Sequence, residues 1–229
     1  MLGVPPTSKR ATIAPAWLAL SCVTAANYGI EAAATTLPRG ESAARRAVAL
    51  DPDDPVAHTA FGLVTLNFHF RADEAIASYR KAIELAPSFA SAWQFLAEAW
   101  SVSGHHPEAI AAADQAVELE PFSPVVHAVR GLVLQAARRP QEALEALDQA
   151  LLLDPRFTWV HRYRGHALTR LGRKRAAAFV AEVQGWGEHG EELAKLERLV
   201  AERDLTGYWE WRLAQLLAMR EQGGAPKPT

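Results

Sequence analysis

The sequence predicts an all-α fold in which antiparallel helix pairs stack into a solenoid, and three observations support this prediction. Pro87, Pro121 and Pro155 lie 34 residues apart, and Pro52 lies 35 residues before Pro87. A unit of that length accommodates two helices of about 13 residues and two short turns. Alanine, the best helix former, is abundant. It also recurs at the 34-residue step upstream of the prolines, at Ala75, Ala109 and Ala143.

The first expected unit covers residues 14–54. Trp17 and Leu20 occupy its first helix, and the run PRGESAARRAVALDP forms its second helix. The linking run NYGIEAAATTL is about seven residues too long for a plain unit, so we expect an insertion there. The preceding residues, 1–13, have no apolar period and are expected to be disordered.

Four further units are expected at residues 55–89, 90–123, 124–157 and 158–187. Each has a small residue in the middle of its first helix, which permits close approach of neighbouring backbones, at Gly62, Ala97, Gly131 and Gly165. One helix pair cannot bury its apolar face alone, so the pairs must stack. The pattern is lost near Gly185. Residues 188–221 are then expected to form capping helices, and 222–229 a disordered tail.

The unit 90–123 carries seven residues of a known repeat pattern: Trp93, Leu96, Ala97, Trp100, Ala109, Ala116 and Pro121. Over residues 14–187 the sequence resembles the tetratricopeptide repeat, although Ala113 stands where the family places an aromatic residue. The first unit, with its insertion, is similar to the repeat regions of bacterial adenylate cyclases and winged-helix regulators. The resemblance implies a right-handed superhelix of about five helix pairs, whose first helices line a concave groove.

The resemblance also implies that offsets 2, 5, 9, 12 and 13 of each first helix face this groove. Ordinary helix surface is the alternative interpretation. Family members that bind acidic chaperone tails carry Lys, Asn and Arg at these offsets, and that set is missing, so such partners are not expected. The candidate partner-binding residues are Thr59, Asn67, Gln94, Glu98, Ser101, Gln135, Trp159, Arg162, His166 and Arg170.

Catalytic, cofactor and metal sites are not expected. The chain has no nucleophile elbow, no glycine-rich phosphate loop and a single cysteine, Cys22. His58, His127 and His161 share offset 4, a position that packs between helices, so we assign them to the repeat framework. Zinc needs nitrogen ligands within about 2.1 Å, which histidines on neighbouring units do not reach in ordinary geometry. We therefore expect neither an enzyme nor a bound cofactor.

Charge is balanced overall but uneven locally. The 24 basic and 26 acidic side chains nearly cancel, which excludes a general polyanion binder. Residues 156–175 nevertheless hold seven Lys or Arg and no acidic residue. This segment is either a solvated face or a patch for an acidic peptide, a phosphate-bearing partner or nucleic acid. Trp159 and Tyr163 could stack there on a planar ligand.

The predicted function is a non-catalytic scaffold or adaptor that binds a peptide or protein segment in the groove. The first alternative is a sensory or regulatory module acting with a separate cyclase, kinase or DNA-binding partner. Nucleic-acid or small-molecule binding is the next alternative. On the last expected helix, Trp211 and Tyr208 project away from the apolar side that would cap the repeats. They therefore either contact a partner or a second copy of the chain, or are covered by residues 190–204.

No apolar run is long enough to cross a membrane. A cytoplasmic location is therefore expected. The alternative is export or a lipid anchor at Cys22, suggested by the run TSKR followed by ATIAPAWLALSC.

Overall fold

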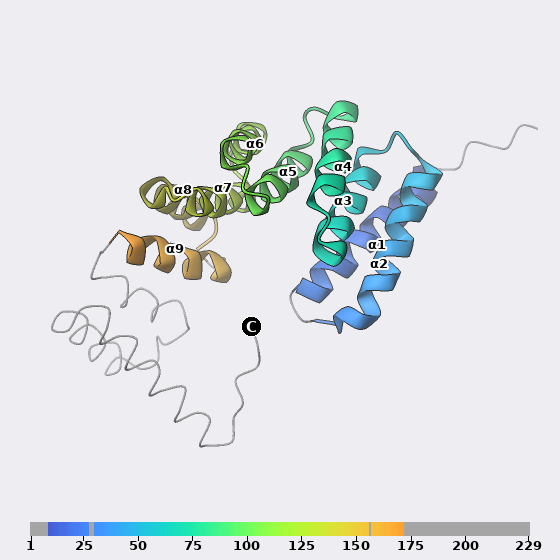
Figure 1. Cartoon of the computed structure of the whole chain (residues 1–229), viewed down its shortest axis with the longest axis horizontal. Coiled ribbons are helices and arrows are strands. Elements are labelled where there is room, and N and C mark those ends of the chain that lie inside the picture. The colour runs from blue at the N-terminus through green and yellow to red at the C-terminus, as the bar shows by residue number, and fades with distance from the viewer. Residues whose placement is uncertain (1–8, 28–29, 156, 172–229) are drawn as a thin grey trace, which may run out of the picture. The chain divides into compact units, whose positions relative to one another are not determined.

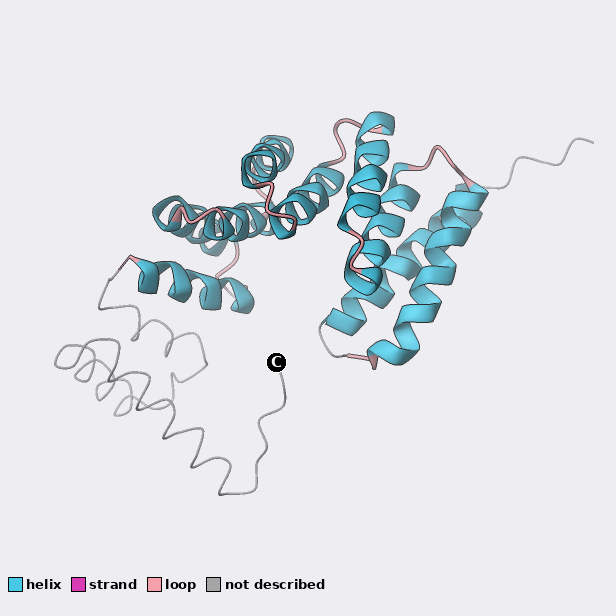
Figure 2. Ribbon diagram, in the orientation of Figure 1, coloured by secondary structure: helices cyan, strands magenta, loops and turns pink. Residues whose placement is uncertain are grey.

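The computed structural model describes residues 9–27, 30–155 and 157–171, and every regular element in them is a helix (Figures 1 and 2). The chain divides into two compact units, Met1–Pro121 and Phe122–Thr229. Within each unit, consecutive helices pack as pairs. The predicted all-α fold of stacked helix pairs is confirmed.

Unit 1 contains three helix pairs. They are α1 (Lys9–Asn27) with α2 (Ala33–Leu50), α3 (Pro55–His69) with α4 (Ala72–Leu85), and α5 (Ala90–Val102) with α6 (His106–Leu119). Helix α3 also packs on α1 and α2, and α5 packs on α4 and α3. Small side chains fill the core and let the helices approach closely, among them Ala16, Ala19, Ala44, Ala47, Ala57 and Ala60.

Unit 2 contains α7 (Pro124–Ala136), α8 (Pro140–Leu153) and α9 (Thr158–Arg170). Helix α8 packs on both α7 and α9, around a core of Ala128, Leu147, Ala150 and Val160. Helices α3, α5, α7 and α9 begin at residues 55, 90, 124 and 158, where the repeats were expected to begin. The expected segments 172–187, 188–221 and 222–229, with Tyr208 and Trp211, lie outside the described residues.

The first helix pair differs from its sequence-based expectation. Helix α1 begins at Lys9 and contains Pro15, so residues 9–13 are helical and the expectation of disorder over 1–13 is wrong for them. Helix α2 begins at Ala33 and contains Pro38, so part of the expected insertion is helical. A proline inside a helix removes one hydrogen bond. The buried alanines between α1 and α2 offset that loss.

The turn after each of α3, α5 and α7 contains a residue whose backbone enters the left-handed region. These residues are Phe70 with φ 54°, Gly104 with φ 82° and Arg138 with φ 59°, and they lie 34 residues apart. Glycine adopts this conformation without strain, whereas a side chain with a Cβ atom adds about 1 kcal/mol. The turn geometry is therefore constant, although only the middle repeat has the residue that suits it best.

Two helix pairs depend on a glycine at their closest approach. A Cβ atom on Gly62 would lie 2.6 Å from the Tyr79 ring, and one on Gly131 would lie 2.6 Å from Cγ of Leu147. The middle repeat has buried alanines, Ala97 and Ala113, at the two corresponding positions. A large residue on the second helix is thus matched by glycine on the first helix.

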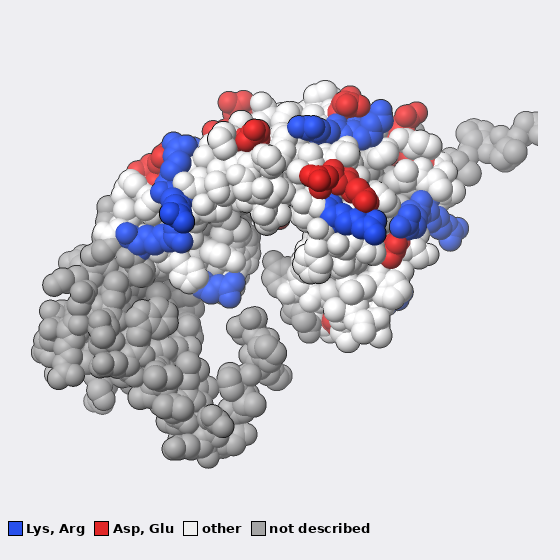
Figure 3. Space-filling view, in the orientation of Figure 1, with Lys and Arg blue, Asp and Glu red and all other residues white. Residues whose placement is uncertain are grey.

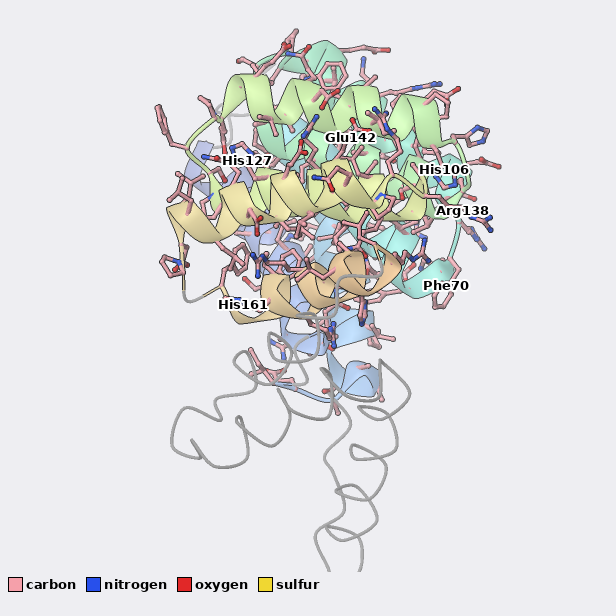
Figure 4. The ribbon with its side chains drawn as sticks, turned by 90° about the vertical axis from the view of Figure 1, so that its left-hand side faces the viewer. Phe70, His106, His127, Arg138, Glu142 and His161 are labelled. Atoms are coloured by element: carbon pink, nitrogen blue, oxygen red, sulfur yellow. The ribbon has the colours of Figure 1, made fainter. Side chains whose placement is uncertain are left out.

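A hydrogen bond joins each of three first helices to the turn that precedes it. Trp93 Nε1 donates to the carbonyl of Pro87 at 2.9 Å. His58 Nε2 lies 2.7 Å from the carbonyl oxygen of Pro52, and His161 Nε2 lies 2.9 Å from that of Pro155. Within unit 2, Figure 4 shows His127 and His161 at the same end of α7 and α9.

Candidate partner-binding surface

A polar pair lies on α5 of unit 1. Gln94 and Glu98 are one helical turn apart, and Gln94 Nε2 donates to Glu98 Oε1 at 3.2 Å. Both side chains are half-buried. Ser101, one turn further along, is also half-buried. These three candidates therefore share one side of α5, as the repeat offsets predicted.

The Glu98 carboxyl group is held toward its neutral form. Burial raises its pKa to about 7, and the hydrogen bond from Gln94 only partly opposes this effect. Within the described residues Gln94 is its hydrogen-bond partner, and no cation lowers its pKa. A carboxylate has about four lone-pair sites. Most of its accepting capacity is therefore unused.

Tyr79 of α4 packs against α5 from the interior, and the sequence analysis did not select it. Its side chain is fully buried and its ring stacks on Phe95 of α5, with centroids 5.9 Å apart. Its hydroxyl has no hydrogen-bond partner in the described part of the chain. Burial, and then the charge of Glu98, raise the pKa of this hydroxyl, so Glu98 acts on it electrostatically.

The two candidates on α3 have polar groups that are already used. Thr59 is buried, and its hydroxyl donates to the carbonyl of Pro55 at 2.8 Å. Thr59 therefore lies in the core, and the expectation that it lines an open groove is wrong. Asn67 donates to the carbonyl of Leu63 at 2.9 Å and accepts from Asn27 of α1 at 3.3 Å. It links α1 to α3.

In unit 2, Gln135 and Trp159 hold α9 in place. Gln135 Nε2 of α7 donates to the carbonyl of Tyr163 at 2.6 Å. Trp159 is half-buried and meets the edges of Phe157 and Tyr163, with centroids 4.8 and 5.7 Å away. Their packing fixes the face of α9 from which the remaining candidates project.

Arg162, His166 and Arg170 follow one another at steps of four along α9, and all three are exposed. The Arg162 guanidinium lies 5.1 Å from the centroid of the Tyr163 ring. Partial burial lowers the pKa of His166, and the charges of Arg162 and Arg170 lower it further. This stripe differs from Arg164 on the same helix, which forms an ion pair with Asp148 of α8.

Other charges are interspersed and paired. On α4, Arg71 lies 3.3 Å from Glu74 and Lys81 lies 3.5 Å from Glu84. Figure 3 shows acidic and basic side chains side by side on the described surface. Exposed pairs of this kind contribute about 0–1 kcal/mol each. They add little to stability, but they prevent a broad surface of a single charge.

Comparison with known proteins identifies the architecture. A family model described as tetratricopeptide repeat matches residues 69–133. The solved structure of pilF from Pseudomonas aeruginosa is similar, with a TM-score of 0.68 and 20% identity over 95% of this chain and 94% of that one. This chain has the tetratricopeptide-repeat fold.

Two further structures resemble this tetratricopeptide-repeat chain. A thermophilic tetratricopeptide-repeat protein in Thermus thermophilus has a TM-score of 0.64 at 18% identity, over 83% of this chain and 98% of that one. YrrB, described as having an unusual peptide-binding site, has a TM-score of 0.56 at 21% identity, over 79% of this chain and 98% of that one. No curated protein matches the sequence significantly. The resemblance to cyclase and winged-helix repeat regions stays a prediction.

The described part of the chain offers little for other kinds of site. There, no three His, Cys, Asp or Glu side chains lie in a position to hold a metal ion. None of the described helices is long and apolar enough to cross a membrane. Cys22 is a buried free thiol in the middle of α1. A lipid chain on Cys22 would therefore have to leave the packed interior of this fold.

Proposed function

We propose that this chain is a non-catalytic scaffold that binds a segment of a partner protein along the first helices of its repeats. The main support for this proposal is the hydrogen-bonded pair of Gln94 and Glu98. The Glu98 carboxyl group is half-buried and has one neutral hydrogen-bond partner. Such a group destabilises the folded state, because burial without compensating hydrogen bonds costs about 1–3 kcal/mol. A bound segment that supplies donors would offset that cost.

The fold supports this proposal. Helix-pair solenoids present extended recognition surfaces, and YrrB, which shares the fold, is described as having a peptide-binding site. Within unit 2, the α9 stripe is a separate candidate surface. Arg162, His166 and Arg170 suit an acidic stretch of a partner, and Trp159 beside them adds apolar area.

Affinity capture from the native host, followed by mass spectrometry, tests the proposal. The unmodified chain is compared with a groove variant carrying Gln94→Ala and Glu98→Gln, and with an α9 variant carrying Arg162→Ala and His166→Ala. Glu118→Gln and Gln149→Ala, on exposed positions of second helices, are the controls. We expect a partner that either test variant loses and both controls retain. Equal capture by all variants contradicts binding along the first helices.

The identity of the captured partner separates a general scaffold from a regulatory module. A cyclase, kinase or DNA-binding protein among the groove-dependent partners favours the regulatory alternative. Nucleic-acid binding has its own test, because phosphate contacts weaken steeply with salt. A gel shift that persists at low salt and depends on Arg162 and Arg170 would favour it. The net charge of −2 and the paired surface charges support a protein partner instead.

Association of two copies through Trp211 and Tyr208 stays a prediction, because both residues lie outside the described part. Light scattering of the purified chain and of its Trp211→Ala variant tests it. A dimer that dissociates in the variant supports the contact. A monomer in which Trp211→Ala changes neither mass nor stability contradicts both this contact and coverage by residues 190–204.

A further inference from the structure

The side chain of Tyr79 is clamped between two first helices. On one side Gly62 of α3 leaves space that even a single Cβ atom would fill, since that atom would lie 2.6 Å from the Tyr79 ring. On the other side the ring stacks on Phe95 of α5 with an interplanar angle of 22°. The ring therefore cannot turn to find a new hydrogen-bond partner, and its hydroxyl stays where the packing places it.

This fixed hydroxyl and the Glu98 carboxyl group both make fewer hydrogen bonds than they could in the described residues. The Tyr79 hydroxyl is buried without a partner in the described residues, and Glu98 acts on it electrostatically. Glu98 receives one hydrogen bond, from Gln94. The amide oxygen of Gln94 is a further acceptor beside them. We call the half-buried pair Gln94 and Glu98 the acceptor cluster.

The cations nearest to the cluster in sequence are engaged elsewhere. Arg80, which follows Tyr79, places its guanidinium 5.3 Å from the centroid of the Trp100 ring. Lys81 forms an ion pair with Glu84 on its own helix. The Glu98 carboxyl group receives no lowering of its pKa from any cation, so the protein leaves this negative site without a counter-charge.

We propose that the acceptor cluster binds a lysine or arginine side chain of the partner segment. The inference rests on the proposed function and gives the partner its chemistry. The cationic head donates to the half-buried Glu98 carboxylate, with the amide oxygen of half-buried Gln94 as a further acceptor. A head with three or five N–H donors matches a site made of acceptors. The half-buried Phe95 ring offers apolar surface to the methylene stem.

Other side chains fit this cluster less well. An acidic group would be repelled by Glu98, and an apolar one would leave the carboxyl group without further hydrogen bonds. A neutral amide donates two hydrogen bonds but brings no charge to a buried carboxylate. Charge-assisted hydrogen bonds are about twice as strong as neutral ones, so the cluster discriminates in favour of a cation.

Panning a library of random 12-residue peptides against the full chain at pH 8, followed by fluorescence anisotropy of the selected peptides, tests this inference. We expect the selected peptides to share a Lys or Arg, and we expect its change to Gln to weaken binding about 10-fold or more. Glu98→Gln in the protein should weaken binding of the unchanged peptide by a similar factor. The matched change Glu118→Gln, at an exposed site on α6, should leave binding unchanged.

A double-mutant cycle identifies the contact. The peptide change and Glu98→Gln should together weaken binding hardly more than either alone, because each removes the same interaction. Tyr79→Phe should change the affinity for the basic peptide and for its Gln version by less than about 3-fold, because the buried hydroxyl does not contact the peptide directly. Circular dichroism of each variant establishes that the helices persist.

The outcomes separate the two proposals. Peptides that bind in a Gln94-dependent way, but tolerate Glu98→Gln or lack any essential basic residue, overturn the acceptor cluster and leave the scaffold function standing. Additive effects in the cycle overturn the direct contact. Binding that is unaffected by every first-helix variant contradicts the scaffold surface itself, and the acceptor cluster fails with it.

Discussion

The two units place different chemistry on equivalent positions of one scaffold. Gly62 makes room for Tyr79 in unit 1, and Gly131 makes room for Leu147 in unit 2. The ninth position of the next first helix is Glu98 in unit 1 and His166 in unit 2. The small residues set the spacing of the helices. The residues at the ninth position differ in the charge that they can carry.

Both ninth-position groups are shifted toward their neutral forms, although in opposite pKa directions. Burial is the largest cause in each case, because it disfavours whichever form carries charge. The neighbours then differ. Glu98 has the neutral Gln94 beside it, whereas Arg162 and Arg170 flank His166. Our proposals therefore assign a positive partner group to unit 1 and a negative one to unit 2.

The largest expected difference between the two units is in how the free energy of unfolding depends on pH. The pKa of Glu98 is about 7 in the folded chain and about 4.5 when unfolded, so the folded state binds its proton more tightly. The free energy of unfolding should therefore fall as pH rises from about 4.5 to about 7, by up to about 3 kcal/mol. Urea denaturation at several pH values should show this fall, and Glu98→Gln should remove it.

His166 should give the opposite slope. Its pKa is lowered in the folded chain, so the unfolded state binds its proton more tightly and stability falls as pH drops below about 6.5. His166→Gln should remove this component alone. The contrast between the units fails if Glu98→Gln and His166→Gln alter the pH profile in the same direction.

A second comparison concerns the two glycines. Gly62→Ala forces a Cβ atom against a stacked aromatic ring, and overpacking of this kind costs about 1–3 kcal/mol. The gain in helix propensity, about 1 kcal/mol, offsets only part of this cost. Calorimetry should show a clear fall in the unfolding temperature.

Gly131→Ala should cost less, because Leu147 can change its rotamer more easily than Tyr79 can move its ring. Combining Gly131→Ala with Leu147→Ala recreates the alanine pair of the middle repeat. That double variant should restore the close contact between α7 and α8, but it loses the apolar area that the Leu147 side chain buries. Equal losses for Gly62→Ala and Gly131→Ala would show that the ring is not held as tightly as its stacking implies.

Tyr79→Phe should raise stability by about 1 kcal/mol, since it removes a buried hydroxyl that has no partner in the described residues. Tyr163→Phe is the matched control from unit 2, because the Tyr163 hydroxyl accepts from Arg162 at 3.5 Å. No gain is expected there. Thermal unfolding of both variants measures the difference, and a loss of stability in Tyr79→Phe would reveal a bond made by that hydroxyl.

The smallest expected effect lies in the turns. Phe70→Gly and Arg138→Gly should each stabilise the chain by about 0.5–1 kcal/mol, because glycine adopts positive φ without strain. Phe70 is 85% exposed, so its loss removes little packing. The fixed turn geometry is the same in both units, and a gain at only one of the two sites would show that the units differ there. Differential scanning calorimetry is sensitive enough for this comparison.

The 34-residue period predicted the helix pairs well, because the prolines mark helix ends and small residues mark close approaches. The period failed in the first pair, where α1 and α2 extend through residues that the pattern assigned to a disordered segment and a linker. It also placed Thr59 on an open surface. One set of offsets cannot describe every unit, because α3 also packs against the longer α1 and α2.

Tyr79 escaped the sequence analysis for a different reason. Its position is the one at which the repeat family places an aromatic residue, so the family pattern accounts for its buried ring. That pattern says nothing about the hydroxyl. Glu98 lies 19 residues further along, on another helix, and only the three-dimensional packing brings the two groups into electrostatic contact.

The hydrogen bond between a ring nitrogen and the preceding proline carbonyl has a consequence for how such chains grow. Donor and acceptor are six residues apart in each of the three cases, His58, Trp93 and His161. A gene segment that encodes one repeat from its proline onward therefore encodes the complete joint. Tandem duplication of such a segment would copy the turn together with the helix residue that is hydrogen-bonded to it.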